Sequence, residues 1–206
     1  MYFCRKLLPF SLALLVCCAR VPASAQATKQ DRVPMWQEAR RSAAKGTRIT
    51  VPPPILRELT ADPEDCPQPS PGETTKMDAY RVRSGHQSLV AVWGRGSCFC
   101  SPTGNCAFWV YRHRLGKYEK ILDTDMVREF GFLESGARGY RDLVTWAHDS
   151  ADRAPAFVYR FNGTKYEALC SWEEHYQYRE LPDGKWVLAG GPQIVGNTCG
   201  TDAKER

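Results

Sequence analysis

Apolar and polar residues alternate along short stretches of the chain, and one such pattern occurs twice. The stretch GHQSLVAVW at 85–93 and the stretch GYRDLVTWA at 139–147 both lead from a glycine into Leu-Val and a tryptophan. Each is followed by a loop and by two further apolar stretches joined across a glycine, at 108–122 and 156–170. Val, Phe, Tyr and Trp suit a half-buried, pleated surface. The pattern therefore predicts a three-stranded antiparallel meander in each copy.

A shorter unit recurs three times: Tyr-Arg, a turn containing glycine, then Lys and an aromatic residue. Its tyrosine and closing aromatic residue are Tyr111 and Tyr118, Tyr159 and Tyr166, and Tyr178 and Trp186. Asn162-Gly163 and Asp183-Gly184 fall at two of the turns, and both pairs tolerate the positive φ of a type I′ hairpin. The third unit, at 176–188, is a partial copy. Because a lone hairpin is marginal in water, we expect the copies to share one aromatic layer.

Alternation also predicts which side chains share a face of the sheet. Trp109 and Tyr111 are expected on the face that Phe157 and Tyr159 occupy in the second copy, because residues two apart point the same way. The segment between the copies, 123–138, fits either a strand or a short helix. We predict an all-β domain of repeated antiparallel hairpins, arranged as a small sandwich, a barrel-like domain or a propeller fragment, with an irregular N-terminal arm.

The beginning of the chain has the pattern of an export signal. Residues 1–25 carry a basic start, an apolar run and the small residues Ala-Ser-Ala before Gln26. The run is shorter than the roughly 20 residues that span a bilayer. We therefore predict an exported chain, periplasmic or extracellular, without a transmembrane segment. Cys17 and Cys18 in the apolar run leave a lipid anchor as an alternative.

Composition divides the remaining chain into three parts. Residues 26–75 are rich in proline and contain one stretch, MWQEARRSAA, that favours a short helix. We interpret them as an arm or linker. Residues 76–200 form the predicted β domain, and residues 201–206 form a tail.

The charge balance argues against a nucleic-acid partner. Residues 1–25 hold three of the 28 basic residues and no acidic residue, which leaves 25 basic residues against 23 acidic ones. A nucleic-acid-binding protein usually carries a concentrated basic stripe, and the sequence shows none.

Six cysteines follow residue 25, and an even number in an exported chain favours disulfides. They are Cys66, Cys98, Cys100, Cys106, Cys170 and Cys199. We predict a local Cys100–Cys106 bridge, which leaves Cys98 for Cys66. Cys170 and Cys199 would then tie down the C-terminal segment. The spacing C-x-C-x5-C lacks the paired C-x2-C and the histidines of a zinc site, so neither a metal nor a cofactor is expected.

The second copy resembles a known repeat family. The stretch SGARGYRDLVTWAHDS, followed by AFVYRFNG, is similar to the bacterial FG-GAP or VCBS type of β-repeat. The likeness lies in Gly139, the Asp-Leu-Val of 142–144 and the aromatic hairpin of 159–163, and it extends at most over 85–190. The alternating aspartates of that family's calcium loop are missing from ESGARG. The resemblance implies an exported binding or scaffold module, without a calcium site or a full propeller.

Candidate catalytic groups are few. The sequence contains no P-loop, no H-E-x-x-H and no dinucleotide fingerprint, and GRGSC at 94–98 lacks the pattern of a nucleophile elbow. His148 precedes Asp149, and His175 follows Glu173 and another glutamate. A hydrolase that uses His148 or His175 with a nearby carboxylate is therefore the alternative function. The pattern favours a binding protein over an enzyme.

The aromatic residues suggest a binding surface. We expect Trp172, within the polar stretch CSWEEHY, to be exposed, whereas Trp93 and Trp146 occupy matching strand positions and should be buried. Exposed aromatic residues stack on sugars or anchor protein partners. The candidate surface residues are Trp172, Glu173, His175, Tyr176, His148 and Asp149.

These features together predict a function in binding. We expect the loops at 98–106, 148–155 and 172–176 to form a surface for a protein or glycan partner in the envelope or the medium. An inhibitor of a secreted enzyme and an envelope assembly factor are two versions of this prediction. A purely structural envelope protein is a further alternative, and the sequence does not predict an oligomeric state.

Overall fold

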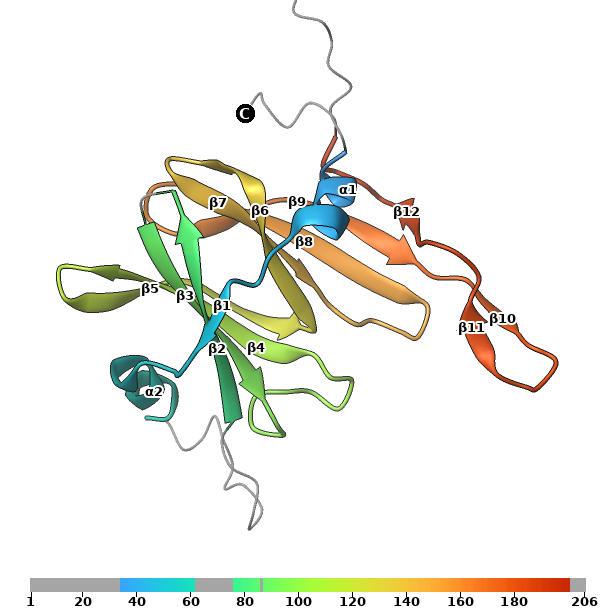
Figure 1. Cartoon of the computed structure of the whole chain (residues 1–206), viewed down its shortest axis with the longest axis horizontal. Coiled ribbons are helices and arrows are strands. Elements are labelled where there is room, and N and C mark those ends of the chain that lie inside the picture. Colours follow the sequence, from blue (N-terminus) through green and yellow to red (C-terminus); the bar gives the residue numbers. More distant parts are fainter. Residues whose placement is uncertain (1–33, 62–75, 86, 201–206) are drawn as a thin grey trace, which may run out of the picture. The chain divides into compact units, whose positions relative to one another are not determined.

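Strands make up most of the described chain. The computed structural model describes residues 34–61, 76–85 and 87–200, within one unit at 33–206 (Figure 1). The predicted export signal and the predicted tail at 201–206 lie outside the described residues. Two helices are present in the described part, α1 (Met35–Ser42) and α2 (Pro53–Leu59). The strands are β1 (Thr47–Ile49), β2 (Lys76–Ser84), β3 (Gln87–Arg95), β4 (Cys106–Arg114), β5 (Lys117–Val127), β6 (Glu129–Ala137), β7 (Tyr140–Trp146), β8 (Arg153–Phe161), β9 (Tyr166–His175), β10 (Tyr178–Glu180), β11 (Trp186–Leu188) and β12 (Gln193–Val195).

The strands form two five-stranded antiparallel sheets and a separate hairpin. The first sheet has the order β1-β2-β3-β4-β5, and the second has the order β12-β9-β8-β7-β6. Among the described strands, β10 pairs only with β11. The predicted meanders are β3-β4-β5 and β7-β8-β9, and each has one further strand before it, β2 or β6. The segment 123–138 is extended, so its helical alternative is wrong. The all-β prediction is confirmed, and the described strands do not close into a barrel.

Residues from both sheets pack into one core between them. Leu89 and Phe108 come from the first sheet, and Phe130, Phe132 and Leu143 come from the second; none is more than 2% exposed. The ring of Phe130 contacts the rings of Tyr80, Trp93 and Phe108, and its centroid lies 4.5 Å from that of Phe108. Burial of such side chains supplies most of the favourable free energy of folding.

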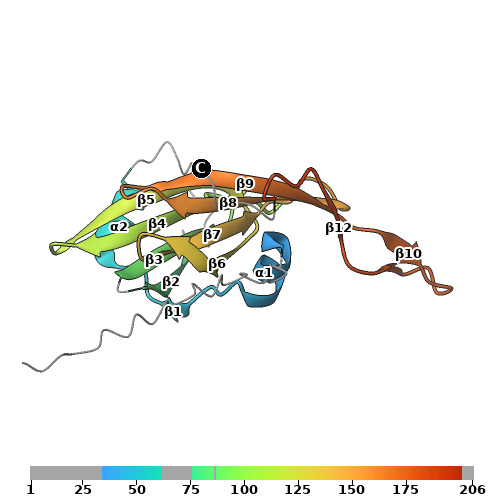
Figure 2. The same ribbon diagram turned by 90° about the horizontal axis from the view of Figure 1, so that it is seen from above.

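The described part of the N-terminal arm, residues 34–61, packs against the outer faces of the two sheets. Ile55 of α2 is fully buried against Val92 and Tyr111 of the first sheet. Ala39 of α1 is buried against Val158 of the second sheet. Between the helices, β1 pairs with β2 at the edge of the first sheet (Figures 1 and 2). Residues 34–61 of the arm are therefore part of the packed structure.

The helix α1 forms in the stretch where the sequence favours a helix. Met35, Trp36, Ala39 and Ala43 recur at helical spacing and pack against the second sheet. The acidic side chain of the first turn and the basic side chains of the last turn also complement the helix dipole.

The C-terminal segment lies against the same sheet. The predicted disulfide between Cys170 of β9 and Cys199 is confirmed. The Thr198 amide donates to the Ser171 carbonyl oxygen at 2.9 Å, next to this bridge. Cys199 is 1% exposed and belongs to the core over the second sheet. The bridge holds the segment after β12 in place.

The pairing of the first strand with the second differs by one residue between the two copies. Val90 pairs with Tyr111 in the first copy, whereas Val144 pairs with Val158 in the second. Tyr111 therefore packs under α2, while its counterpart Tyr159 packs against the core between the sheets. A one-residue shift turns side chains to the opposite face. The prediction that Tyr111 and Tyr159 share a face is thus wrong. Rings of both copies, among them Phe108 and Phe161, nevertheless share the core between the sheets, as the sequence predicts.

The tryptophans of the two copies also lie on different faces of their sheets. Trp93 and Trp146 are buried, 5% and 6% exposed, as the sequence predicts. Trp93 lies in the core between the sheets, and Trp146 lies in the core under α1. Their positions along the strands therefore do not match.

The predicted hairpins are present, but their turns differ from the prediction. In the turn after β8, φ is positive only at Gly163, while the Asn162 side-chain oxygen accepts the amides of Thr164 and Lys165 at 2.8 and 3.0 Å. The side chain thus stabilises the turn as an Asx motif. Positive φ at both central residues, as in a type I′ turn, occurs instead at Leu115 and its following glycine.

The equivalent turns of the two copies touch each other. Gly85 lies in the turn after β2 at φ +57°, and a Cβ there would lie 2.5 Å from the carbonyl oxygen of Gly139. The buried hydroxyl of Ser84 accepts the amide of Arg141 at the same junction. Tyr166 donates from its hydroxyl to the Arg141 carbonyl oxygen at 2.7 Å. Only glycine fits at position 85.

Candidate functional surface

The first two predicted loops meet through Asn105. Its side chain is 2% exposed, and it exchanges two hydrogen bonds of 2.7 Å with the backbone of His148. The imidazole Nδ1 of His148 lies 3.0 Å from the carbonyl oxygen of Thr103. These contacts fix the loop after β7 against the loop before β4.

The loop before β4 is closed by a disulfide. The predicted Cys100–Cys106 bridge is confirmed. Within it, the Ser101 amide donates to the Asn105 carbonyl oxygen at 2.7 Å. Cys98 is also disulfide-bonded; its predicted partner, Cys66, lies outside the described residues, so that pairing stays a prediction.

The third predicted segment adjoins the loop after β7. The amide of Tyr176 donates to the Asp152 carbonyl oxygen at 2.7 Å. The hydroxyl of Tyr178 donates to the Ala151 carbonyl oxygen at 3.0 Å. Hydrogen bonds therefore connect all three loops that the sequence singles out into one continuous surface, which we call the loop surface (residues 101–105, 148–153 and 175–178).

Trp172 is not exposed, and its prediction as a surface residue is wrong. It is 2% exposed and packs edge-on against Trp146, with ring centroids 6.4 Å apart. Alternation along β9 turns it toward the core under α1, where Ala156 is its cross-strand neighbour. The polar residues around it in the sequence belong to the opposite face or to a buried polar cluster.

That buried cluster is centred on Glu174. Its carboxylate is fully buried, and Oε1 accepts the indole N–H groups of Trp146 and Trp172, each at 3.0 Å. Oε2 accepts the hydroxyl of Tyr176 at 2.6 Å. Arg40 of α1 completes the cluster with an ion pair and a 3.0 Å bond from Nε to Oε1. A buried charge is tolerated only when it is paired in this way. Tyr176 thus has a structural contact in addition to its place at the loop surface.

Glu173 and His175 lie together on the opposite face of β9. His175 Nε2 is 2.7 Å from Glu173 Oε1, and both side chains are more than one third exposed. Their separation of two residues along a strand explains the contact. Asp149 forms an ion pair with Arg153 at 3.7 Å.

The two histidines therefore differ in what they contact. His175 has a carboxylate neighbour, as the hydrolase alternative requires, whereas His148 is held by backbone and amide groups. Asp152, in the loop beside His175, accepts the Ser150 hydroxyl at 2.6 Å. This hydrogen bond lowers the pKa of Asp152 below its ordinary value.

The most exposed aromatic residue of the described chain is one that the sequence pattern did not single out. Trp186 in β11 is 63% exposed, and its neighbours Tyr178 and Leu188 are 42% and 52% exposed. Tyr178 pairs with Leu188, and Glu180 pairs with Trp186, so these four side chains share one face of the hairpin. We call this the hairpin face. Figures 1 and 2 show the β10–β11 hairpin extending away from both sheets.

A signal for this exposure exists in the sequence. The third unit lacks the first strand that the other two copies have, so its hairpin has no meander of its own to join. Tyr178 fixes the base of the hairpin to the loop surface through Ala151. The hairpin face and the loop surface are therefore contiguous.

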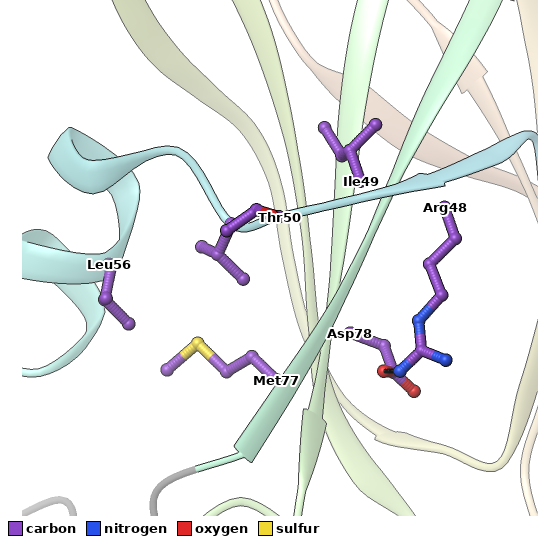
Figure 3. Close-up of a pocket in the computed structure, with 7 residues that line it drawn as sticks. Arg48, Ile49, Thr50, Leu56, Met77 and Asp78 are labelled. Carbon is purple, nitrogen blue, oxygen red and sulfur yellow. Dashed lines mark hydrogen bonds and ion pairs between the residues drawn. The ribbon is translucent and has the colours of Figure 1, made fainter.

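An open cavity of about 650 Å³ lies elsewhere, beside β1. Figure 3 shows Arg48 reaching toward Asp78 on one side of it, with Leu56 and Met77 on the other. Asp78 also accepts Arg95 Nε at 2.8 Å. Burial alone would raise the pKa of Asp78, but the hydrogen bond and charge of Arg95 and the charge of Arg48 outweigh it and lower the pKa. The ion pairs occupy the two charged side chains that line this cavity.

The described residues offer no further assignment by chemistry or by similarity. Across 34–61, 76–85 and 87–200, no group of three or more His, Cys, Asp or Glu side chains is placed to hold a metal. Neither helix of this part of the chain is long and apolar enough to cross a bilayer. No protein-family model, curated protein or solved structure matches the chain.

Proposed function

We propose that this protein is an exported binding protein that engages a protein or glycan partner through the hairpin face and the adjoining loop surface. One observation carries the proposal: three large apolar side chains, Tyr178, Trp186 and Leu188, lie exposed on one face of a projecting hairpin. Exposed apolar patches of this kind mark interaction sites. Tryptophan and tyrosine are also the residues that most often dominate binding energy.

The contacts that restrain the loop surface also support this proposal. The Cys100–Cys106 bridge and the bonds between Asn105 and His148 restrain the loop surface before any partner arrives. A restrained surface loses less conformational entropy on binding. The proposal does not depend on the resemblance to FG-GAP or VCBS repeats, which stays a prediction.

The compartment is part of the same proposal. Two disulfides in the described chain are consistent with an oxidising, extracytoplasmic location. Export through residues 1–25 is the proposed route.

A comparative capture experiment tests the proposed function. The oxidised protein is immobilised and exposed to envelope and secreted fractions and to a glycan array. We expect the double variant Trp186→Ala/Leu188→Ala to lose a captured species that the wild type retains. The control is Leu115→Ala, because Leu115 is 91% exposed in the distant turn after β4. Capture that is equal for both variants and the wild type would contradict the proposed surface.

A hydrolase is the second candidate function. The contact of 2.7 Å between His175 and Glu173 favours it, because a general base needs a carboxylate that orients its imidazole. The hydroxyl of Ser150, in the loop after β7, is the nucleophile that this candidate would use; in the structure it donates to Asp152. Turnover of ester, peptide and glycoside substrates by the wild type, lost in His175→Ala and in Ser150→Ala, would establish this function; turnover retained in both variants would remove it.

A further inference from the structure

The hairpin face combines aromatic rings with one carboxylate. Glu180 and Trp186 are directly opposite each other in the β10–β11 pair, next to the Tyr178–Leu188 pair. The other charges of the hairpin lie elsewhere: Arg179 is on the opposite face, opposite Val187. In the turn, Lys185 and Asp183 form an ion pair of 2.8 Å.

Glu180 differs from the other acidic groups around it. Among the described residues it forms no ion pair, whereas Asp149 contacts Arg153, Glu173 contacts His175 and Asp183 contacts Lys185. The hairpin face therefore presents one uncompensated negative charge beside a largely exposed indole.

This pairing is the chemistry that recognises a cation. The face of an indole attracts ammonium and guanidinium groups, and a carboxylate at its edge adds a charge-assisted hydrogen bond. Tyr178 and Leu188 extend the same face with apolar surface. The complementary partner has a Lys or Arg side chain flanked by apolar residues.

We propose that the hairpin face binds a protein segment in which a Lys or Arg side chain is set among apolar residues, with the cation held between Trp186 and Glu180. This inference rests on the proposed function and narrows its partner from a protein or glycan to a basic, apolar segment of a protein. Tyr178, fixed through its hydroxyl to Ala151, supplies a rigid apolar neighbour at the base of the site.

Titrations with defined probes test the inference. The probes are a capped peptide of alternating Lys and Leu, its Glu and Leu counterpart, and a hexasaccharide of N-acetylglucosamine. Binding is located by NMR of the Trp186 indole N–H, which is assigned from the spectrum of Trp186→Phe. We expect the Lys-Leu peptide alone to shift this signal, and we expect the affinity to fall at high salt because the carboxylate is exposed.

Matched variants distinguish the contacts of Glu180 and Trp186 from a nonspecific effect of the protein's charge. Glu180→Gln should weaken binding of the Lys-Leu peptide about three- to tenfold, and Trp186→Ala at least as much. Glu134→Gln removes one exposed carboxylate on β6 and should leave the affinity unchanged. Equal losses in Glu180→Gln and Glu134→Gln would overturn the proposed contact.

The probes also distinguish this inference from the proposed function. A shift of the Trp186 signal by the Glu-Leu peptide or the hexasaccharide, and not by the Lys-Leu peptide, would overturn the cation site while supporting a binding surface. No shift by the Lys-Leu peptide overturns the inference in every case. The proposed function itself fails only if the capture experiment also shows no dependence on Trp186.

Discussion

The hairpins β8–β9 and β10–β11 are built from the same short sequence unit but differ in whether their closing aromatic residue is buried. Both contain Tyr-Arg, a glycine turn and Lys followed by an aromatic residue. Tyr166 closes the first unit and is 4% exposed, whereas Trp186 closes the second and is 63% exposed. The local sequence determines a hairpin in both places, but neighbouring strands determine whether its aromatic residue stabilises the fold or remains available to a partner.

The largest expected effect is a difference in stability between these two aromatic positions. Tyr166→Ala should lower the free energy of unfolding by about 3–5 kcal/mol, because it removes a buried ring and the hydrogen bond to the Arg141 carbonyl. Trp186→Ala should change it by less than about 0.5 kcal/mol. Urea unfolding of both variants measures the difference, and similar losses would remove the distinction between the two hairpins.

The next largest expected loss of stability concerns the buried cluster around Glu174. Arg40→Ala leaves the buried carboxylate of Glu174 without its cation and should lower stability by about 2–3 kcal/mol. This loss is at the low end of the range for a buried ion pair because the side chain of Arg40 is 36% exposed. Arg41→Ala, at the exposed neighbouring position, is the control. Thermal unfolding that is equally affected by both would show that the Glu174 cluster does not hold α1.

Gly85 and Gly184 both have a positive φ, but only Gly85 is packed against another turn. Gly85→Ala places a methyl group 2.5 Å from the Gly139 carbonyl oxygen and should cost about 1–3 kcal/mol beyond the strain of its positive φ. Gly184, in the turn of the projecting hairpin, has a similar φ of +80°, and a methyl group added there would meet no other atom within 4 Å. Gly184→Ala should therefore cost only the backbone strain, about 1 kcal/mol. Urea unfolding of both variants measures the two costs, and equal losses would indicate that the turns of the two copies are not packed together.

The smallest effect concerns pH. The pKa of Asp78 is lowered from the ordinary 3.8 by its arginine neighbours, so its stabilisation is present above this value and is lost as the pH falls through the lowered pKa. Asp78→Asn should therefore lower stability at pH 7 and match the wild type more closely near pH 2. The pKa of Asp183 is also lowered, by Lys185, but it lies in the exposed hairpin. Asp183→Asn should change the pH dependence of unfolding much less than Asp78→Asn, because its pair with Lys185 is exposed and screened by solvent. An equally large effect would contradict this view.

The sequence predicts the elements better than their faces. Glycine turns and alternating aromatic residues define the meanders and all three hairpins, because these signals are local. The one-residue difference in pairing between Val90 with Tyr111 and Val144 with Val158 depends on how each strand docks. No local pattern specifies it, so the predicted common face of Tyr111 and Tyr159 is wrong, although rings of both copies do meet in the core between the sheets.

The face of a strand residue also decides the case of Trp172, which the sequence wrongly predicts to be exposed. Trp172 is surrounded by polar residues in the sequence, but Glu174 accepts hydrogen bonds in the core and Glu173 lies on the other face. Polar neighbours therefore do not indicate exposure here. Trp186 is exposed because β10 and β11 pair only with each other within the described chain. The missing first strand of the third unit is the sequence signal for this pairing, whereas composition around Trp186 does not indicate it.

Site-specific photo-crosslinking tests the claim that the hairpin face is a binding surface most directly. A photoreactive amino acid is placed at position 186 in one sample and at position 115 in another, both exposed apolar sites in β-hairpins. Irradiation in the envelope and secreted fractions should give a discrete crosslinked species from position 186 and none from position 115. The same products from both positions, or none from position 186, would contradict it.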